Sequence, residues 1–502
     1  MHIPSDIIYL ISDYNSDVGD SIYLSLINRE IYENSHKIFL NNPLITYENH
    51  RILSKYNLKN FKLEKNLMIM NYNKYYRKVN KYLIEKITDL DMIPKDIREL
   101  RIKLEEDIKV INLKEFDIDS IIIENININT EIIYPNNLTH ITFGNFFNQL
   151  IDLPDSLTHL TFGYEYNQPI NLPNNLTHLT IGICFNQSIT LPNNLTQLTF
   201  NERSFYNQPI NLPNSLTQLT FGRNYVHSLT LPNNLTHLTL GEYFDQPINL
   251  PDSLTHLTFG RTYDVSIILP NSLTHLTLGD NFNQPINLPD SLTHLTFDKY
   301  SNFNQPITLP NNLTHLTFGR NFNQPLTLPD SLTHLTFGWY FNQPINLPDS
   351  LTHLTFDKHS NFDQPITLSS NLMHITFGKC FNQVIDLPDS LVCLTFGGRF
   401  NQSIRLPNSL KSIILEDALY TWPINLIDEN TGKTFKDLEY VDLGIGYINE
   451  LKIGRIEDKS KKVTIKFNYN FFNRIFPNKT QYDFNNYILI NSLDDKRINL
   501  IW

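Results

Sequence analysis

Apolar and polar residues alternate along short stretches that recur through most of the chain. Within residues 157–163, Leu160 and Phe162 are two positions apart, and His159 and Thr161 occupy the positions next to them. Such alternation places apolar side chains on one face of an extended strand and polar ones on the other. The pattern predicts a half-buried β-strand with Leu160 and Phe162 turned inward.

The residues after this strand predict a return without a helix. We expect residues 166–168 to turn the chain, because Asn satisfies backbone groups in tight bends. Pro169 and Pro173 stand four residues apart, which excludes a helix and disfavours an interior strand. Ile170 and Leu172 alternate with a polar residue, so we expect both to point inward.

The motif Leu-Pro-x-x-Leu-Thr-His-Leu-Thr-Phe-Gly recurs at a nearly fixed period. From Pro135 to Pro407, eleven intervals between equivalent positions are 19 residues and three are 21, with Ser369 replacing one proline. Such self-similarity indicates a solenoid. Ordering each residue costs ~1 to 2 kcal/mol, which one isolated repeat cannot offset by burial, so each turn, which we call a rung, must stack on its neighbours.

The repeats diverge toward both ends of the array, as terminal caps of solenoids do. Residues 93–102 and 118–123 are weaker copies, and residues 438–444 repeat the strand half of a rung. We therefore predict four segments. They are a helical segment at 1–45, a helical or polar connector at 46–92, the solenoid at 93–445 and a C-terminal cap at 446–502.

The three 21-residue rungs carry their extra residues directly after the strand. These insertions span residues 201–204, 298–301 and 357–360. Insertions at one strand end map to a single rim of a solenoid. Either this rim carries partner-specific loops, or the fold simply tolerates a longer loop there.

Four segments spell Phe-Asn-Gln-Pro followed by Ile or Leu: 282–286, 303–307, 322–326 and 341–345. Motif and period together resemble the FNIP repeat, a relative of the leucine-rich repeat found in social amoebae and amoeba-infecting giant viruses. The resemblance implies a mainly β, leucine-rich-repeat-like solenoid with a parallel sheet and a helix-free back, preceded by a small α-helical N-terminal segment. It also implies binding of a protein target whose identity is unknown, in a host-virus interaction if the source is viral.

The N-terminal segment has apolar residues at helical spacing after Pro4, and residues 21–31 repeat the pattern. This spacing resembles the F-box, although Ile3 stands where Leu is usual and Asp6 where Glu is usual. The resemblance implies a substrate receptor of an SCF-type ubiquitin ligase. Its Skp1-like adaptor would dock on Ile3, Pro4, Ile7, Ile8, Leu24, Leu26 and Ile27. The alternative is a repeat scaffold whose N-terminal helices only cap the solenoid.

The outward strand position holds histidine in eleven rungs. We take this face as the candidate target-binding surface: His159, Thr161, His178, His256, His275, His294, His315, His334 and His353. An imidazole column could instead bind a divalent metal or sense pH, or could be an exposed ladder spread by duplication. A flat sheet face lacks the convergent geometry of a metal site, so we expect no metal and no cofactor.

Asp155, Ser156 and His159 have the residue types of a hydrolytic triad, and the trio recurs in several rungs. A triad needs one convergent pocket with an oxyanion hole, which repeated copies on a surface do not provide. Asp and Ser after a proline also form turns. We therefore expect no enzyme.

The composition of the chain limits the kinds of partner that it can bind. The 502 residues are 41% hydrophobic and 18% charged, with a net charge of -11, which disfavours nucleic acid. Lysines are frequent in residues 55–86 and 452–479, as solvated faces or as a phosphate or partner contact. Three scattered cysteines form no disulfide framework, and no apolar run is long enough to cross a membrane. We expect a cytoplasmic protein, in the host cytoplasm if viral.

Overall fold

The computed structural model describes the central repeats without interruption and shorter stretches on both sides. The described residues are 44–45, 62–63, 81–84, 90, 93, 97–103, 108–125, 130–415, 424–425, 427–428, 433–434, 437–442, 451–452, 462–466, 483–484, 487–492 and 497–501. Strands are the regular elements of this part of the chain, which contains no α-helix. Two compact units form, Met1–Leu235 (unit 1) and Thr236–Trp502 (unit 2).

Unit 1 contains twelve strands among its described residues. They are β1 (Leu44–Ile45), β2 (Lys62–Leu63), β3 (Lys81–Ile84), β4 (Glu99–Lys103), β5 (Val110–Asn112), β6 (Ser120–Asn125), β7 (Glu131–Ile133), β8 (His140–Phe143), β9 (His159–Thr161), β10 (His178–Ile181), β11 (Gln197–Phe200) and β12 (Gln218–Thr220).

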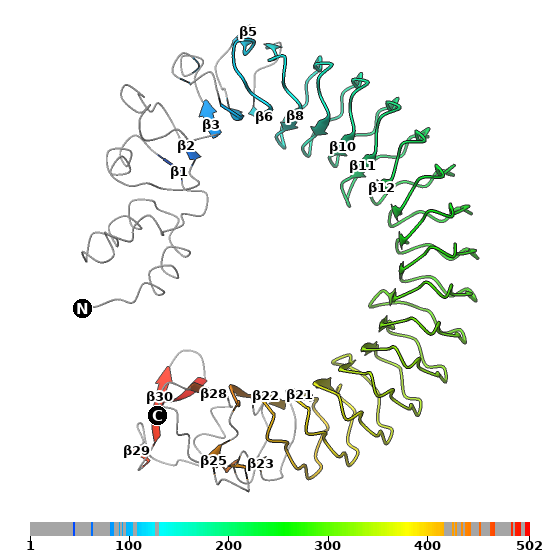
Figure 1. Ribbon diagram of the computed structural model, residues 1–502, viewed down its shortest axis with the longest axis vertical. Helices are drawn as coiled ribbons and strands as arrows, with labels where there is room; N and C mark the ends of the chain where they lie inside the picture. Colours follow the sequence, from blue (N-terminus) through cyan, green and yellow to red (C-terminus); the bar gives the residue numbers. More distant parts are fainter. Residues whose placement is uncertain are drawn as a thin grey trace. The chain divides into compact units, whose positions relative to one another are not determined.

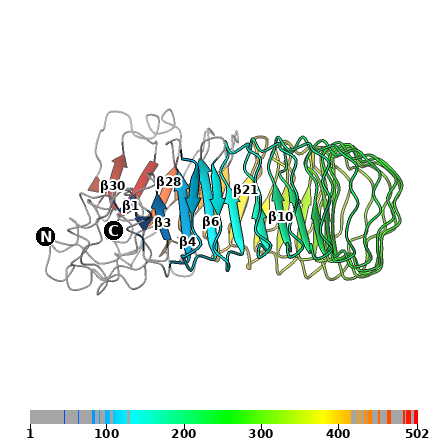
Figure 2. The same ribbon diagram turned by 90° about the horizontal axis from the view of Figure 1, so that it is seen from above.

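The main sheet of unit 1 is parallel and follows chain order. β1, β2, β3, β4, β6, β8, β9, β10, β11 and β12 pair in succession, while β5 and β7 form a separate parallel pair. Figure 2 shows β3, β4 and β6 as neighbouring arrows that point the same way. Parallel pairing therefore already begins at β1, upstream of residue 93.

Unit 2 contains nineteen strands among its described residues. They are β13 (His237–Thr239), β14 (His256–Thr258), β15 (His275–Leu278), β16 (His294–Phe297), β17 (His315–Thr317), β18 (His334–Phe337), β19 (His353–Phe356), β20 (His374–Thr376), β21 (Cys393–Phe396), β22 (Ser412–Leu415), β23 (Ile424–Asn425), β24 (Ile427–Asp428), β25 (Lys433–Thr434), β26 (Tyr440–Asp442), β27 (Leu451–Lys452), β28 (Lys462–Lys466), β29 (Asp483–Phe484), β30 (Tyr487–Ser492) and β31 (Arg497–Ile501).

In unit 2, β13 to β22 pair in parallel, one after another, and β26 and β28 continue the sheet. Pairing then becomes antiparallel through β31, β30 and β29, a different architecture near the C-terminus. Two small pairs lie apart from this sheet: β23 with β27 in parallel, and β24 with β25 antiparallel.

Equivalent residues of successive rungs pair with one another. Leu257 opposes Leu276, for example, and Thr258 opposes Thr277. The 19-residue period and the parallel register together keep apolar side chains above apolar ones. The predicted mainly β parallel solenoid with a helix-free back is confirmed for the described rungs.

The core of each rung is a set of leucines and aromatic rings. As predicted, Leu160 and Phe162 are turned inward and are 1% and 3% exposed. The chain bends around Tyr166, at residues 164, 165 and 168, as predicted. The Tyr166 side chain is also fully buried and stacks on Phe162 at 3.9 Å between ring centroids, a place in the core that the sequence did not predict.

The asparagine after this aromatic residue bonds to the next rung. The Oδ1 atom of Asn148 accepts the backbone N–H of Asn167, and the Oδ1 of Asn167 accepts that of Asn186. Asn does satisfy backbone groups, as expected, but those of the following rung. Ile170 is half-buried, and its equivalents Ile248 and Ile385 are 8% and 5% exposed, so this side chain points inward to a variable depth.

Glycine after the strand allows close stacking. A Cβ on Gly260 would lie 2.0 Å from the carbonyl oxygen of Gly241. Between residues 144 and 397 the glycine is replaced only where a rung has 21 residues, by Asn201, Asp298 and Asp357. In such a rung the loop after the strand is two residues longer, and a buried serine, such as Ser204, accepts a backbone N–H two residues further on. The longer loop thus leaves room for the Asn or Asp side chain that the close contact in a 19-residue rung excludes.

Spacing between equivalent rings increases from one side of a rung to the other. In unit 2, His334 and His353 are 4.2 Å apart, Phe337 and Phe356 are 5.6 Å apart, and the turn phenylalanines beyond them are 6.1 Å apart. Unit 1 shows the same increase. Each unit therefore bends toward its histidine-bearing face, and in Figure 1 strands of the main sheet, such as β10 to β12 in unit 1 and β21 and β22 in unit 2, lie on the inner side of the bend.

Candidate functional site

The candidate site is the outward face of the strands, where histidines form columns. His140, His159 and His178 form one column in unit 1, before Gln197 and Gln218. Unit 2 has eight consecutive histidines: His237, His256, His275, His294, His315, His334, His353 and His374. Neighbouring rings stack nearly in parallel, 4.1 to 4.3 Å apart. The register therefore brings together the histidines named from the sequence, within each unit.

Each of these rings except that of His374, which follows Met373, is held by the threonine that precedes it. The Oγ1 atom of Thr255 lies 2.9 Å from Nδ1 of His256 and also donates to the carbonyl oxygen of Thr236 at 3.0 Å. The same carbonyl accepts the backbone N–H groups of Thr255 and His256. Three hydrogen bonds per rung thus converge on one oxygen, which explains why Leu-Thr-His recurs as a unit.

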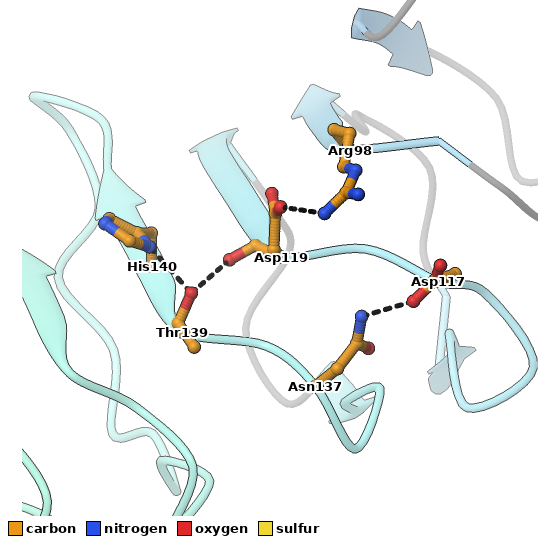
Figure 3. A network of polar contacts seen from close by, with 6 residues as sticks. All are labelled: Arg98, Asp117, Asp119, Asn137, Thr139 and His140. Atoms are coloured by element: carbon orange, nitrogen blue, oxygen red, sulfur yellow. Dashed lines mark hydrogen bonds and ion pairs between the residues drawn. The ribbon is translucent and has the colours of Figure 1, made fainter.

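Figure 3 shows the first member of the unit 1 column. Thr139 lies between the backbone carbonyl of Asp119, 3.1 Å from its Oγ1, and Nδ1 of His140 at 2.8 Å. The Asp119 carboxylate pairs with Arg98 at 2.9 Å. Asn137 donates to the carboxylate of Asp117 one rung earlier. The diverged rung at residues 118–123 therefore supplies the carbonyl oxygen to which Thr139 donates, as later rungs do for the next threonine.

The clamp fixes the tautomer of the imidazole. A threonine hydroxyl has one proton, and a carbonyl oxygen cannot donate, so Oγ1 of Thr255 gives its proton to the carbonyl of Thr236. Nδ1 of His256 must then carry the proton of the second hydrogen bond. Nε2 is left as an acceptor on a half-buried ring. The face therefore offers one nitrogen lone pair at each histidine whose preceding threonine donates to the previous rung.

The column disfavours protonation. Burial, followed by neighbouring histidines, lowers the pKa of His159, His256, His275, His294, His334 and His353. A charge on one ring stands directly above the next ring, so two adjacent rings avoid being charged together. At neutral pH these six rings are therefore mainly neutral and accept hydrogen bonds.

The metal and hydrolase interpretations find no support in this geometry. The described residues contain no group of three or more His, Cys, Asp or Glu side chains placed to hold a metal ion. Ser156 donates to the backbone carbonyl of Leu138 at 2.6 Å, and Nδ1 of His159 is bonded to Thr158. Asp155 and Ser156 lie in the turn before the strand, where Leu157 closes on Pro154. Asp155 and Ser156 therefore form the turn that enters the strand, as expected, and His159 is the first residue of β9.

Sequence reasoning missed two sets of residues. The threonine before each histidine was treated only as a neighbour, although it recurs as regularly as histidine. The second set lies after the strands of unit 2, where Arg320, Trp339 and Tyr340 contact one another. The sequence could have revealed this second set, because positions that vary within a nearly invariant repeat are not needed for the fold and are therefore candidates for binding.

The adaptor-binding residues predicted from the F-box resemblance, Ile3 to Ile27, lie outside the described residues. No helix long and apolar enough to cross a membrane occurs in the part of the chain that the structure describes. The three cysteines are free thiols, each half-buried.

In-register parallel rungs of 19 or 21 residues with inward leucines define a solenoid of the leucine-rich-repeat class. The FNIP Repeat family matches residues 125–165, 147–184, 185–224, 225–262, 263–300, 303–327, 322–359, 362–399 and 381–418. The chain belongs to this FNIP repeat family, which confirms the resemblance identified from its motifs.

Solved structures agree with this assignment. The chain is 39% identical to CroV588, described as a novel circular leucine-rich-repeat protein structure, over 81% of this chain and 70% of that one, with a TM-score of 0.60. YopM from Yersinia enterocolitica WA-314 is 19% identical over 78% of this chain and 92% of its own, with a TM-score of 0.54, and supports the fold alone. No curated protein matches the chain.

Proposed function

We propose that this chain is a protein-binding scaffold that serves as the substrate receptor of an SCF-type ubiquitin ligase. In this proposal the repeats hold a target protein and the N-terminal segment recruits a Skp1-like adaptor. The leucine-rich-repeat class and the FNIP family support the first part, since such arrays serve as binding scaffolds rather than enzymes. The F-box-like spacing of residues 1–45 supports the second.

The observation that carries target binding is the histidine column of unit 2. Six successive rungs, from His256 to His353, each present an Nε2 acceptor, and the rings of the column repeat every 4.2 to 4.3 Å. A small molecule needs convergent groups in a concave pocket. An evenly spaced line of identical acceptors suits an extended surface of a macromolecule, with His/Thr positions such as His294 and Thr161 as contact residues in their respective units.

A variant pair tests this face. The changes His294→Glu and His334→Glu place charges within the acceptor column and should release any protein that the wild type retains from a cell lysate. The matched changes His294→Gln and His334→Gln use the residue found at Gln197 and should keep most of that binding. Equal retention by the Glu and Gln variants would remove the face from the proposal.

The adaptor function is tested with a purified Skp1-like protein. Wild-type chain should retain it in a pull-down, whereas Pro4→Asp and Ile7→Asp should not, because a charge cannot be buried in an apolar interface without a partner. Ser12→Asp, which adds the same charge at a polar position, is the matched control.

The alternative is a scaffold whose N-terminal segment only caps the solenoid. β1 lies at the end of the predicted 1–45 segment and pairs with β2 in parallel, which is compatible with that role. A wild-type chain that does not retain the adaptor, combined with lower thermal stability of Ile7→Asp, would favour the cap.

A further inference from the structure

The turns that follow the strands of unit 2 carry residues unlike the rest of the repeat. Between residues 298 and 399 these turns contribute five cations, Lys299, Arg320, Lys358, Lys379 and Arg399. Backbone hydrogen bonds join them in succession, from Arg320 N to Lys299 O and from Lys379 N to Lys358 O. The cations therefore lie on one rim, on neighbouring rungs.

Aromatic rings occur among these cations. The Arg320 guanidinium lies over Trp339 at 4.7 Å and over Tyr340 at 5.5 Å, and its Nη2 donates to the Tyr340 hydroxyl at 3.4 Å. Trp339 also stacks on Tyr340 and contacts His359. Tyr300 and Tyr340 are 61% and 41% exposed. The cluster is therefore ordered by its own contacts while two large rings face solvent.

This composition is typical of binding surfaces. Trp, Tyr and Arg are the residues most enriched where interfaces gain their affinity, and an ordered cluster loses little side-chain entropy on binding. None of these side chains is required by the rung, since the position of Arg320 holds Glu242 and Asp280 in other rungs. We call Lys299, Tyr300, Arg320, Trp339, Tyr340 and Lys379 the basic-aromatic rim.

Charge is separated across residues 298–399 of unit 2. The same turns contain three carboxylates, Asp298, Asp357 and Asp363, against the five cations. Oδ1 of Asp357 accepts the N–H of His359, and Oδ1 of Asp363 accepts the N–H of Asn382. The turns before the strands carry exposed carboxylates instead: Asp252, Asp290, Asp330, Asp349 and Asp389. With a net charge of -11 for the whole chain, the basic-aromatic rim is a local positive surface on an acidic protein. An acidic partner is attracted to this rim and repelled by the opposite one.

We propose that the basic-aromatic rim binds an acidic, extended segment of a partner protein, with carboxylates on Lys299, Arg320 and Lys379 and apolar side chains against Tyr300 and Tyr340. This inference rests on the proposed protein-binding function and specifies its partner. The overall negative charge favours a peptide over a nucleic acid, which would meet repulsion from the remainder of the chain.

The test begins with a phage-displayed library of random peptides selected on the full chain. Wild type should enrich peptides rich in Asp and Glu. A synthetic copy of an enriched peptide should bind the variant Lys299→Glu, Arg320→Glu, Lys379→Glu at least about tenfold more weakly, measured by fluorescence anisotropy. Glu202 and Glu242 already occupy the positions of Lys299 and Arg320 in other rungs, so this variant is expected to fold. An unchanged far-UV circular dichroism spectrum checks that.

The matched control neutralises the opposite rim with Asp290→Asn, Asp330→Asn and Asp349→Asn, residues that the repeat also uses at this position, and should bind the peptide as well as wild type or better. Enriched peptides that bind the Glu variant equally well would overturn the rim proposal while leaving protein binding intact. Failure to enrich any peptide would count against both. If no acidic peptides are enriched, and a polyuridine oligonucleotide binds the wild type but not the Glu variant, the proposal would be overturned in favour of nucleic acid.

Discussion

Acidification is expected to destabilise unit 2 through its stacked imidazoles. Seven successive ring pairs, from His237 to His374, have centroid separations of 4.2 to 4.3 Å. Two unit charges about 4 Å apart repel by ~1 kcal/mol in water. Charging the whole column therefore costs up to about 7 kcal/mol, which is comparable to the entire stability of many domains.

The lowered pKa values of the histidines determine whether acid raises or lowers the stability of the fold. In the unfolded chain each histidine binds a proton near its ordinary pKa of about 6.5. In the folded chain, burial and then neighbouring rings lower the pKa of His256, His275 and His294. The unfolded state therefore binds more protons below about pH 6.5, so the stability present above that pH is progressively lost as the pH falls toward the folded values.

Thermal unfolding followed by far-UV circular dichroism at about pH 7.5 and about pH 5 measures this loss, and each kcal/mol should lower Tm by roughly 2 to 4 °C. The variant His275→Gln, His315→Gln, His353→Gln removes six of the seven pairs and isolates the column from other acid-titrating groups. Its Tm should depend much less on pH. A wild-type Tm that is no lower at pH 5, or an equal loss in the variant, would refute the reasoning.

Three further changes test the packing of the rungs. Tyr263→Phe should stabilise the protein by about 1 kcal/mol in urea unfolding, because the buried hydroxyl has no hydrogen-bond partner among the described residues. Burial raises the pKa of Tyr263 to about 12, so the variant should also lose less stability as the pH rises above about 10. Gly260→Ala should destabilise by about 1 to 3 kcal/mol in the same assay, because its Cβ would lie 2.0 Å from the Gly241 carbonyl oxygen. Thr255→Val should cost about 1 kcal/mol and free the His256 tautomer, seen as altered imidazole ¹⁵N shifts.

The features that could be predicted from the sequence are those that recur in every rung. Alternation around Leu160 and the 19-residue period gave the strand, its inward face and the parallel register, because stacked rungs can only bury like against like. The histidine column followed from the same periodicity. At residues 201, 298 and 357 the glycine is replaced and the rung is two residues longer. The reason for this coincidence, the close approach of the glycine to the backbone of the preceding rung, became clear only from the structure.

The remaining features depend on contacts between rungs. The turn at Tyr166 was predicted, but the burial of its ring against Phe162 was not, because that ring also stacks between the equivalent rings of the neighbouring rungs. The clamp of Thr255 on His256 joins two rungs through one carbonyl, which no local pattern reveals. The contacts of Arg320 with Trp339 likewise link residues 19 positions apart. The four segment boundaries and the adaptor-binding residues stay predictions.

The register of the parallel ladder has an evolutionary consequence. Because Leu257 meets Leu276 exactly as Leu276 meets Leu295, the upper surface of one such rung has the same shape as that of the next. A recombination event that adds or deletes one whole 19-residue segment within unit 2 rejoins matching surfaces and shifts no side chain from inside to outside. The length available to a ligand can therefore change in discrete steps, whereas the loss of a single residue within a strand would exchange the inward and outward positions of that strand.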